Sequence, residues 1–304
     1  MKPLFISLFI LSFIAGNVLA ENTEDYSNWI SDELGEFIIT PMKNAPYPHA
    51  SRKDGYKRDD TFYSAEEHYM DSSIGILIPS GYAKTDTVDV MIHFHGHGNN
   101  VAKQVMGKQL REMLNASGKN LIMIVPQGPK DARDSSCGKI EDQDGMKNLI
   151  MECLAFLKKE SKTSTETPGK IIVSGHSGGF LPVAACLDAG GMDEHISDVF
   201  LMDASYARLE SYSGWAGRSK GRLLSICTDH LLEENFEIMR NLQKEGITQF
   251  SILLDEDVTP EALTKHRAAF IHTKLTHKTL MYETGYLKRF MATSKVQNKP
   301  VKKE

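Results

Sequence analysis

Cysteine is scarce in this sequence, and no two cysteines stand as a Cys-x-x-Cys pair. The four cysteines are Cys137, Cys153, Cys186 and Cys227. This spacing argues against a structural zinc ribbon, which needs paired thiolates. Cys153 and Cys186 lie in apolar helical patterns and Cys227 lies in an apolar strand pattern, so buried free thiols and disulfides both remain open for these three.

The chain also lacks an excess of positive charge. It has 35 Lys and Arg against 40 Asp and Glu, a formal net charge of −5. A general nucleic-acid binder needs clustered basic residues for its phosphate contacts, and we therefore expect no nucleic-acid partner. The one concentrated basic stretch falls in residues 296–304, which we interpret as a flexible, solvated tail.

No long apolar run occurs after the first twenty residues. Lys2 precedes an apolar stretch over residues 4–15, and Val18-Leu19-Ala20 offers short side chains before a cleavage site. The apolar stretch is shorter than the ~20 residues of a membrane-spanning helix. We predict a signal peptide over residues 1–20, cut after Ala20, and a secreted or periplasmic protein with no stable membrane insertion.

The rest of the chain shows no internal repeat and no low-complexity linker. Residues 21–70 are polar and weakly patterned, and we expect them to wrap the surface. Eight short apolar segments then alternate with helical patterns, at residues 73–79, 88–94, 121–125, 170–174, 199–202, 223–227, 250–254 and 268–275. Strands separated by helices in this way predict a largely parallel sheet with helices on both faces.

A Gly-x-Ser-x-Gly motif follows the fourth of these strands. It consists of Gly175, Ser177 and Gly179 around His176 and Gly178, and a helical pattern comes next. A serine on a sharp strand-to-helix turn needs small neighbours, and its hydroxyl then projects beyond the sheet. The pattern predicts that Ser177 is a catalytic nucleophile.

A second glycine-rich turn follows the strand at residues 88–94. Its sequence is His95-Gly96-His97-Gly98. Acyl transfer needs two N–H donors for the developing oxyanion, and glycines allow a backbone loop to approach the serine closely. We expect the N–H groups of Gly178 and His97 to form the oxyanion hole, with Gly98 as the alternative to His97.

A histidine must take the serine proton, and an acid must orient that histidine. His277 follows the last strand and is the predicted base, while His272 lies inside that segment and is a weaker alternative. Asp203 and Asp229 each end an apolar strand. Asp229 could equally cap the helix that follows it, so we favour Asp203 as the acid and keep Asp229 as the alternative.

The order of glycine loop, Gly-x-Ser-x-Gly motif, aspartate and late histidine resembles the α/β-hydrolase family of serine esterases, lipases and peptidases. The resemblance implies a three-layer α/β sandwich over residues 71–295, with a mostly parallel sheet of about eight strands. It also implies that the serine follows the fifth strand, the acid the sixth or seventh, and the histidine the last. No cofactor is implied.

The predicted function is that of a secreted serine hydrolase that cleaves a carboxylic ester through an acyl-enzyme on Ser177. A serine peptidase or amidase using the same residues is the alternative. Less favoured are a metal-dependent hydrolase with His93, His95 and His97 as ligands and a non-enzymatic binding protein. The short connection between Met202 and Leu223 contains aromatic residues and indicates an open site for a small-molecule or polymer-end ester.

Overall fold

The structure is a computed structural model that describes residues 27–282 and 285–301. The predicted signal peptide, residues 1–20, lies outside the described residues. Within the described part, no helix combines the length and the apolar character that crossing a membrane requires.

Ten strands of the described residues form one sheet. They are β1 (Ile30–Asp32), β2 (Gly35–Pro41), β5 (Ser73–Pro79), β6 (Val88–Phe94), β7 (Ile122–Pro126), β8 (Pro168–His176), β9 (Ile196–Met202), β10 (Arg222–Cys227), β11 (Ser251–Leu254) and β12 (Ala268–His272). Their order is β1-β2-β5-β7-β6-β8-β9-β10-β12-β11. From β7 to β11 all neighbours are parallel, and the pairs that join β1, β2, β5 and β7 are antiparallel.

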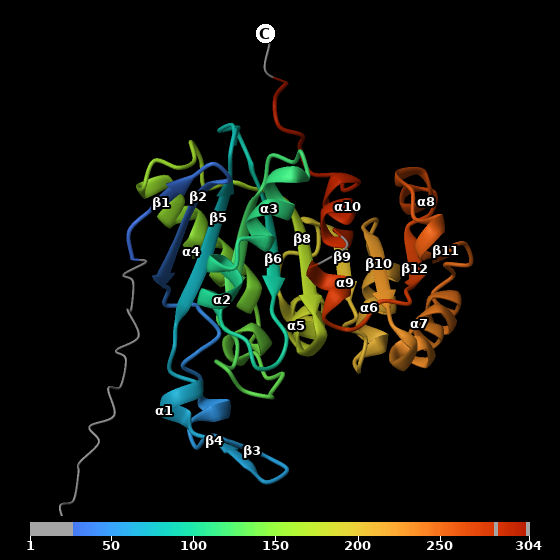
Figure 1. Ribbon diagram of the computed structural model, residues 1–304, viewed down its shortest axis with the longest axis horizontal. Coiled ribbons are helices and arrows are strands. Elements are labelled where there is room, and N and C mark those ends of the chain that lie inside the picture. The colour runs from blue at the N-terminus through green and yellow to red at the C-terminus, as the bar shows by residue number, and fades with distance from the viewer. Residues whose placement is uncertain (1–26, 283–284, 302–304) are drawn as a thin grey trace, which may run out of the picture.

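Helices cover both faces of this sheet (Figure 1). They are α2 (Val101–Met106), α3 (Gln109–Ala116), α4 (Gly145–Lys159), α5 (Phe180–Ala189), α6 (Leu209–Arg218), α7 (Leu232–Lys244), α8 (Pro260–Thr264), α9 (Thr279–Tyr282) and α10 (Tyr286–Ala292). The short helix α1 (Ala65–His68) lies beyond the sheet. Buried side chains of α4, α5, α6 and α7 share one core cluster. Those of α2, α3, α8, α9 and α10 share a second cluster. The molecule is thus the predicted three-layer sandwich.

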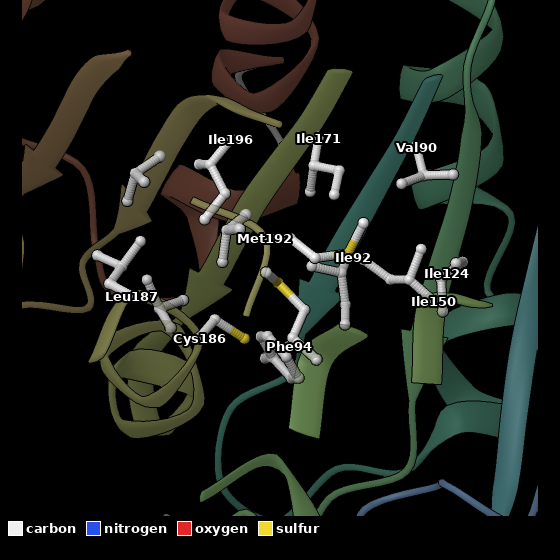
Figure 2. Packing of buried hydrophobic residues seen from close by; sticks show 14 of the residues in the cluster. Val90, Ile92, Phe94, Ile124, Ile150, Ile171, Cys186, Leu187, Met192 and Ile196 are labelled. Carbon is white, nitrogen blue, oxygen red and sulfur yellow. The ribbon is translucent and has the colours of Figure 1, made fainter. Parts of the chain in front are cut away.

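The buried strands divide their side chains between the two clusters. On β6, Ile92 and Phe94 belong to the core beside α4 and α5, while Met91 belongs to the opposite core. Figure 2 shows Ile92 and Phe94 packed near Ile171 of β8 and Cys186 of α5. Because a strand of a parallel sheet is covered on both faces, its sequence reads as a continuous apolar run, which is why these strands were recognisable.

Two expectations need correction at the chain ends. The sheet has ten strands rather than about eight, because residues 21–70, expected to wrap the surface, contribute β1 and β2 to its edge. The tail is not free at its start: Val296 is buried, and the Gln297 N–H donates to Asp89 Oδ2 at 2.7 Å. Lys299 Nζ donates to Asn115 Oδ1 at 2.8 Å. These contacts dock the segment although its sequence is basic.

The four cysteines are free thiols and all are buried. Burial raises the pKa of Cys227 to about 12, and it raises the pKa of Cys153 and Cys186 as well. Of the two possibilities that the sequence left open, the structure therefore contains buried thiols.

One buried ion pair joins β9 and β10, two adjacent strands of the sheet. Arg222 of β10 lies beside Asp198 of β9 in the strand register, and its Nε donates to Asp198 Oδ1 at 2.7 Å. The side chains are 5% and 0% exposed. Arg222 also donates to the Phe290 carbonyl and so links the sheet to α10.

Replacing Asp198 by alanine should lower the free energy of unfolding by about 3–5 kcal/mol, because the Arg222 guanidinium would stay buried without a counter-charge. Urea denaturation monitored by circular dichroism measures this loss. Asp193→Ala is the control, since its ion pair with Arg218 is exposed and such pairs contribute about 0–1 kcal/mol. Equal losses of unfolding free energy in the two variants would show that the buried Arg222–Asp198 pair stabilises the fold no more than an exposed pair does.

Candidate active site

Ser177 sits at a strained turn between β8 and α5. It begins the short 3-10 helix Ser177–Gly179, and its φ of 53° is rare for a residue with a side chain. The motif glycines are required sterically: a Cβ at Gly175 would lie 2.5 Å from the Gly179 carbonyl oxygen, and a Cβ at Gly179 would lie 2.6 Å from the Phe94 carbonyl oxygen. The turn leaves Ser177 partly exposed at the end of the sheet.

The His-Gly loop after β6 packs directly against this turn. A Cβ at Gly96 would lie 2.8 Å from the Cβ of Ser177, and a Cβ at Gly178 would lie 2.3 Å from the His97 ring. The Gly98 N–H donates to the Ala132 carbonyl at 2.9 Å and is therefore engaged. In the part of the chain that the structure describes, no backbone hydrogen bond occupies the His97 N–H. Of the two amides considered from the sequence, that of His97 is the available one.

Asp203 is the aspartate that contacts His277. It follows β9, is fully buried, and accepts a hydrogen bond from His277 Nδ1 on Oδ2 at 2.6 Å. The Thr228 N–H donates to Oδ1 at 2.9 Å. Burial alone would raise the pKa of Asp203, but the hydrogen bonds from His277 and Thr228 outweigh it and lower the pKa. The carboxylate is therefore held ionised against the imidazole.

The alternative acid and the alternative base also meet, but away from this pair. Asp229 is 89% exposed, and its Oδ1 lies 2.7 Å from His272 Nε2. Cys227 and His272 are register neighbours on β10 and β12, which brings Asp229, two residues further on, beside the histidine. The structure thus places the two aspartates in two separate Asp–His pairs.

The His277 imidazole lies beside the residue that precedes Ser177. Its ring stacks on the His176 ring with 4.8 Å between centroids, and His176 Nε2 lies 3.1 Å from the His277 carbonyl oxygen. With Nδ1 bonded to Asp203, the imidazole carries its proton there and leaves Nε2 as the basic nitrogen. The geometry is suited to general-base chemistry at the turn.

A group of polar residues around this pair was not expected from the sequence. His230 Nε2 lies 2.9 Å from the Tyr206 hydroxyl, and His230 Nδ1 lies 2.5 Å from Thr228 Oγ1. Burial raises the pKa of Tyr206 and Asp203 adds to the rise, while contact with the Ser177 hydroxyl opposes it. Their positions in the sequence could have indicated them, since these residues occupy the turns that follow the strands of the two candidate acids.

The three alternating histidines do not come together as a metal site. His93 Nδ1 lies 3.1 Å from Ser174 Oγ, His95 Nε2 accepts the Gly128 N–H at 3.1 Å, and His97 Nε2 lies 2.8 Å from Ser135 Oγ. Among the described residues, the set whose donor atoms could surround one ion is Asp203, His230 and His277, within 4.8 Å of one another. An ion there would occupy the atoms of the Asp–His pair.

Ser177 opens into a cleft of about 680 Å³. Its lining includes Gly178 and His97, the aromatic side chains of Tyr206 and Phe180, and arginines from the N-terminal segment and from the loop after β7. Figure 1 shows α1 and the two-stranded hairpin β3 (Tyr56–Arg58) and β4 (Thr61–Tyr63) projecting beyond the sheet. The cleft is large enough for a small organic group and open to solvent.

Comparison with known proteins identifies the fold. No family model and no curated protein matches the chain. Its structure matches that of the feruloyl esterase module from Clostridium thermocellum, a serine-to-alanine mutant complexed with sinapinate. That match has a TM-score of 0.50 at 12% identity and covers 84% of this chain and 90% of that one. A protein described as FAE matches with a TM-score of 0.51 at 11% identity, covering 89% and 91%. This likeness confirms the predicted α/β-hydrolase fold.

Two buried histidines beside the site should make the free energy of unfolding decrease as the pH is lowered. Burial lowers the pKa of His93 to about 3. Burial and the neighbouring His277 lower that of His176 to about 4. In the unfolded chain each histidine has a pKa of about 6.5, so as the pH is lowered the unfolded chain binds a proton before the folded chain does. The stabilisation is complete above about pH 6.5 and is lost toward pH 4, at about 1.4 kcal/mol per pH unit for each histidine.

Urea denaturation at pH 6.5, 5.5 and 4.5 measures this dependence. The His93→Leu variant lacks one of the two titrating groups, so its free energy of unfolding should fall less steeply over the same range. A wild-type stability that stays constant between pH 6.5 and 4.5 would show that neither histidine is held neutral.

Proposed function

We propose that this chain of α/β-hydrolase fold is a serine hydrolase that cleaves a carboxylic ester through an acyl-enzyme on Ser177. The observation that carries the proposal is the hydrogen bond of 2.6 Å between the buried Asp203 carboxylate and the half-buried His277 imidazole. The His277 ring also stacks on His176, the residue before the Ser177 turn. The feruloyl esterase module with the same fold supports ester cleavage as the reaction.

The first half of the reaction forms the acyl-enzyme. Ser177 Oγ attacks the ester carbonyl while His277 Nε2 takes the hydroxyl proton. Asp203 keeps the proton of the imidazole on Nδ1 and stabilises the imidazolium that forms. The carbonyl oxygen becomes negative in the tetrahedral intermediate and is bound by the N–H groups of His97 and Gly178. His277 then gives its proton to the departing alkoxide, and the alcohol leaves.

The second half releases the acid. Water gives a proton to His277 Nε2 and attacks the acyl carbonyl, through the same oxyanion site, and Ser177 leaves as the protonated hydroxyl. The partly exposed cleft admits this water directly. Each group serves in both halves, so the proposed cycle ends with the enzyme in its starting state and requires no cofactor.

We further propose that the protein acts after export. The predicted signal peptide would be removed after Ala20, and the enzyme would meet a small-molecule or polymer-end ester outside the cytoplasm. The domain from residue 71 to residue 295 would carry the reacting groups, with the preceding segment shaping the cleft.

Replacement of Ser177 by alanine should remove the nucleophile. We expect kcat on a 4-nitrophenyl ester to fall by roughly 10³- to 10⁶-fold, and a fluorophosphonate probe should label the wild type once and this variant not at all. Ser164→Ala, at an exposed serine that bonds the Thr85 carbonyl, should be labelled normally. An active Ser177→Ala enzyme would disprove the proposed mechanism.

The two aspartates should differ sharply in a matched test. Asp203→Asn should reduce kcat by roughly 10⁴-fold, because the amide no longer holds the tautomer of His277 that leaves Nε2 basic. Asp229→Asn, which alters the exposed pair with His272, should keep kcat within about twofold of wild type on the reasoning that exposed pairs contribute little. Steady-state kinetics measures both, and the reverse order would assign the acid to Asp229.

A further inference from the structure

The cleft beside Ser177 is lined by more positive than negative side chains. Three arginines, Arg52, Arg58 and Arg133, face it together with one aspartate, Asp134. The chain as a whole carries a net charge of −5, so this concentration of arginine runs against the overall composition. Such a reversal of sign in a binding cleft raises the local concentration of a ligand of opposite charge.

Asp134 compensates only the first of these arginines. Arg52 Nε donates to Asp134 Oδ2 at 2.7 Å, and Arg52 Nη2 donates to Asp134 Oδ1 at 3.0 Å, a bidentate pair. The Tyr69 hydroxyl adds a third bond to the same carboxylate at 3.1 Å. The Arg52 guanidinium also lies over the Tyr56 ring, 4.7 Å from its centroid. Arg52 and Asp134 therefore form an anchor for the base of the hairpin.

Arg58 and Arg133 keep their charges available. Neither forms an ion pair among the residues for which the structure gives side chains. Arg58 Nη1 donates to the Arg133 backbone carbonyl at 2.9 Å, which ties the hairpin to the loop that carries the second guanidinium. Burial lowers the pKa of His97, and the positive charges of Arg58 and Arg133 lower it further against the effect of Asp134. Both charges thus act on the loop beside Ser177.

The hairpin presents its residues according to the period of a strand. Successive side chains of β3 point to opposite faces, so Tyr56 and Arg58 line the cleft while Lys57 between them is exposed. A planar guanidinium binds a carboxylate through two parallel N–H donors. The unpaired arginines therefore offer the donor geometry that a carboxylate group requires, next to an aromatic wall.

We infer that Arg58 and Arg133 bind a carboxylate group of the substrate, so that the enzyme prefers esters of acidic molecules. The inference rests on the proposed ester hydrolysis and specifies its substrate class. The carboxylate belongs either to the acyl part or to the alcohol part of the ester. In both cases the arginines would bind a carboxylate in the same way. Esters that carry the carboxylate on one part or on the other distinguish the two cases.

Two pairs of esters test the preference. For the acyl part, mono-4-nitrophenyl adipate is compared with 4-nitrophenyl hexanoate; for the alcohol part, 4-acetoxybenzoate is compared with 4-acetoxybenzamide. In at least one pair the acidic ester should have a kcat/KM roughly 10- to 100-fold higher, the range expected for hydrogen bonds to a charged group. The ratio should shrink as salt is added, because the arginines are reached by solvent.

Variants assign the preference to these arginines. In the Arg58→Gln/Arg133→Gln double variant the ratio of acidic to neutral kcat/KM should fall to about one, mainly through KM, and Arg58→Lys should retain part of it because the charge remains. Lys57→Gln removes the same charge from the exposed face of the same strand and should leave the ratio unchanged.

The outcomes separate this inference from the proposed function. If neutral esters are cleaved in a Ser177-dependent manner but neither acidic ester is preferred, the carboxylate site is overturned and the ester hydrolase stands. If the preference exists and persists in the double variant, the assignment to Arg58 and Arg133 is overturned. If no ester is cleaved and Ser177 is not labelled, the proposed function itself fails.

Discussion

The arrangement of the site depends on one hydrogen bond, between the buried Asp203 carboxylate and the His277 imidazole. The two residues are 74 positions apart, and they meet because β9, β10 and β12 are adjacent parallel strands whose carboxyl ends share one edge. Thr228, at the end of the middle strand, donates to the same carboxylate. The hydrogen bonds from His277 and Thr228 outweigh the cost of burying the charge, so the pKa of Asp203 is lowered and the carboxylate stays ionised.

A steric constraint brings the proposed nucleophile and the proposed oxyanion donors together. The glycines at positions 96 and 178 allow the loop after β6 and the turn after β8 to approach closely, because a Cβ at Gly96 would meet the Cβ of Ser177 and a Cβ at Gly178 would meet the His97 ring. The positive φ of Ser177 is maintained by the packing of strand and helix on either side.

The segment before the parallel sheet contributes edge strands and part of the lining of the cleft. It adds two strands to one edge of the sheet. It then forms the hairpin that projects beyond the sheet (Figure 1), and Tyr56 and Arg58 of this hairpin line the same cleft as Ser177. The bidentate pair of Arg52 and Asp134 holds this hairpin to the loop after β7. The groups of the proposed reaction thus lie at the end of the sheet, whereas the arginines of the cleft come from this N-terminal segment and from the loop after β7.

The local features could be predicted from the sequence: the eight apolar strands, the helices between them, and the serine turn defined by Gly175 and Gly179. Local periodicity and steric need are encoded in neighbouring residues, so they can be read without a structure. The contact of Asp203 with His277 and of Asp229 with His272 follows from the folded arrangement, because both aspartates end apolar strands and the sequence could favour one of them only through the helix-capping position of Asp229. The tertiary structure also decided that the His97 amide is available and that Arg58 faces the cleft. Those facts depend on contacts between distant segments, which no local pattern records.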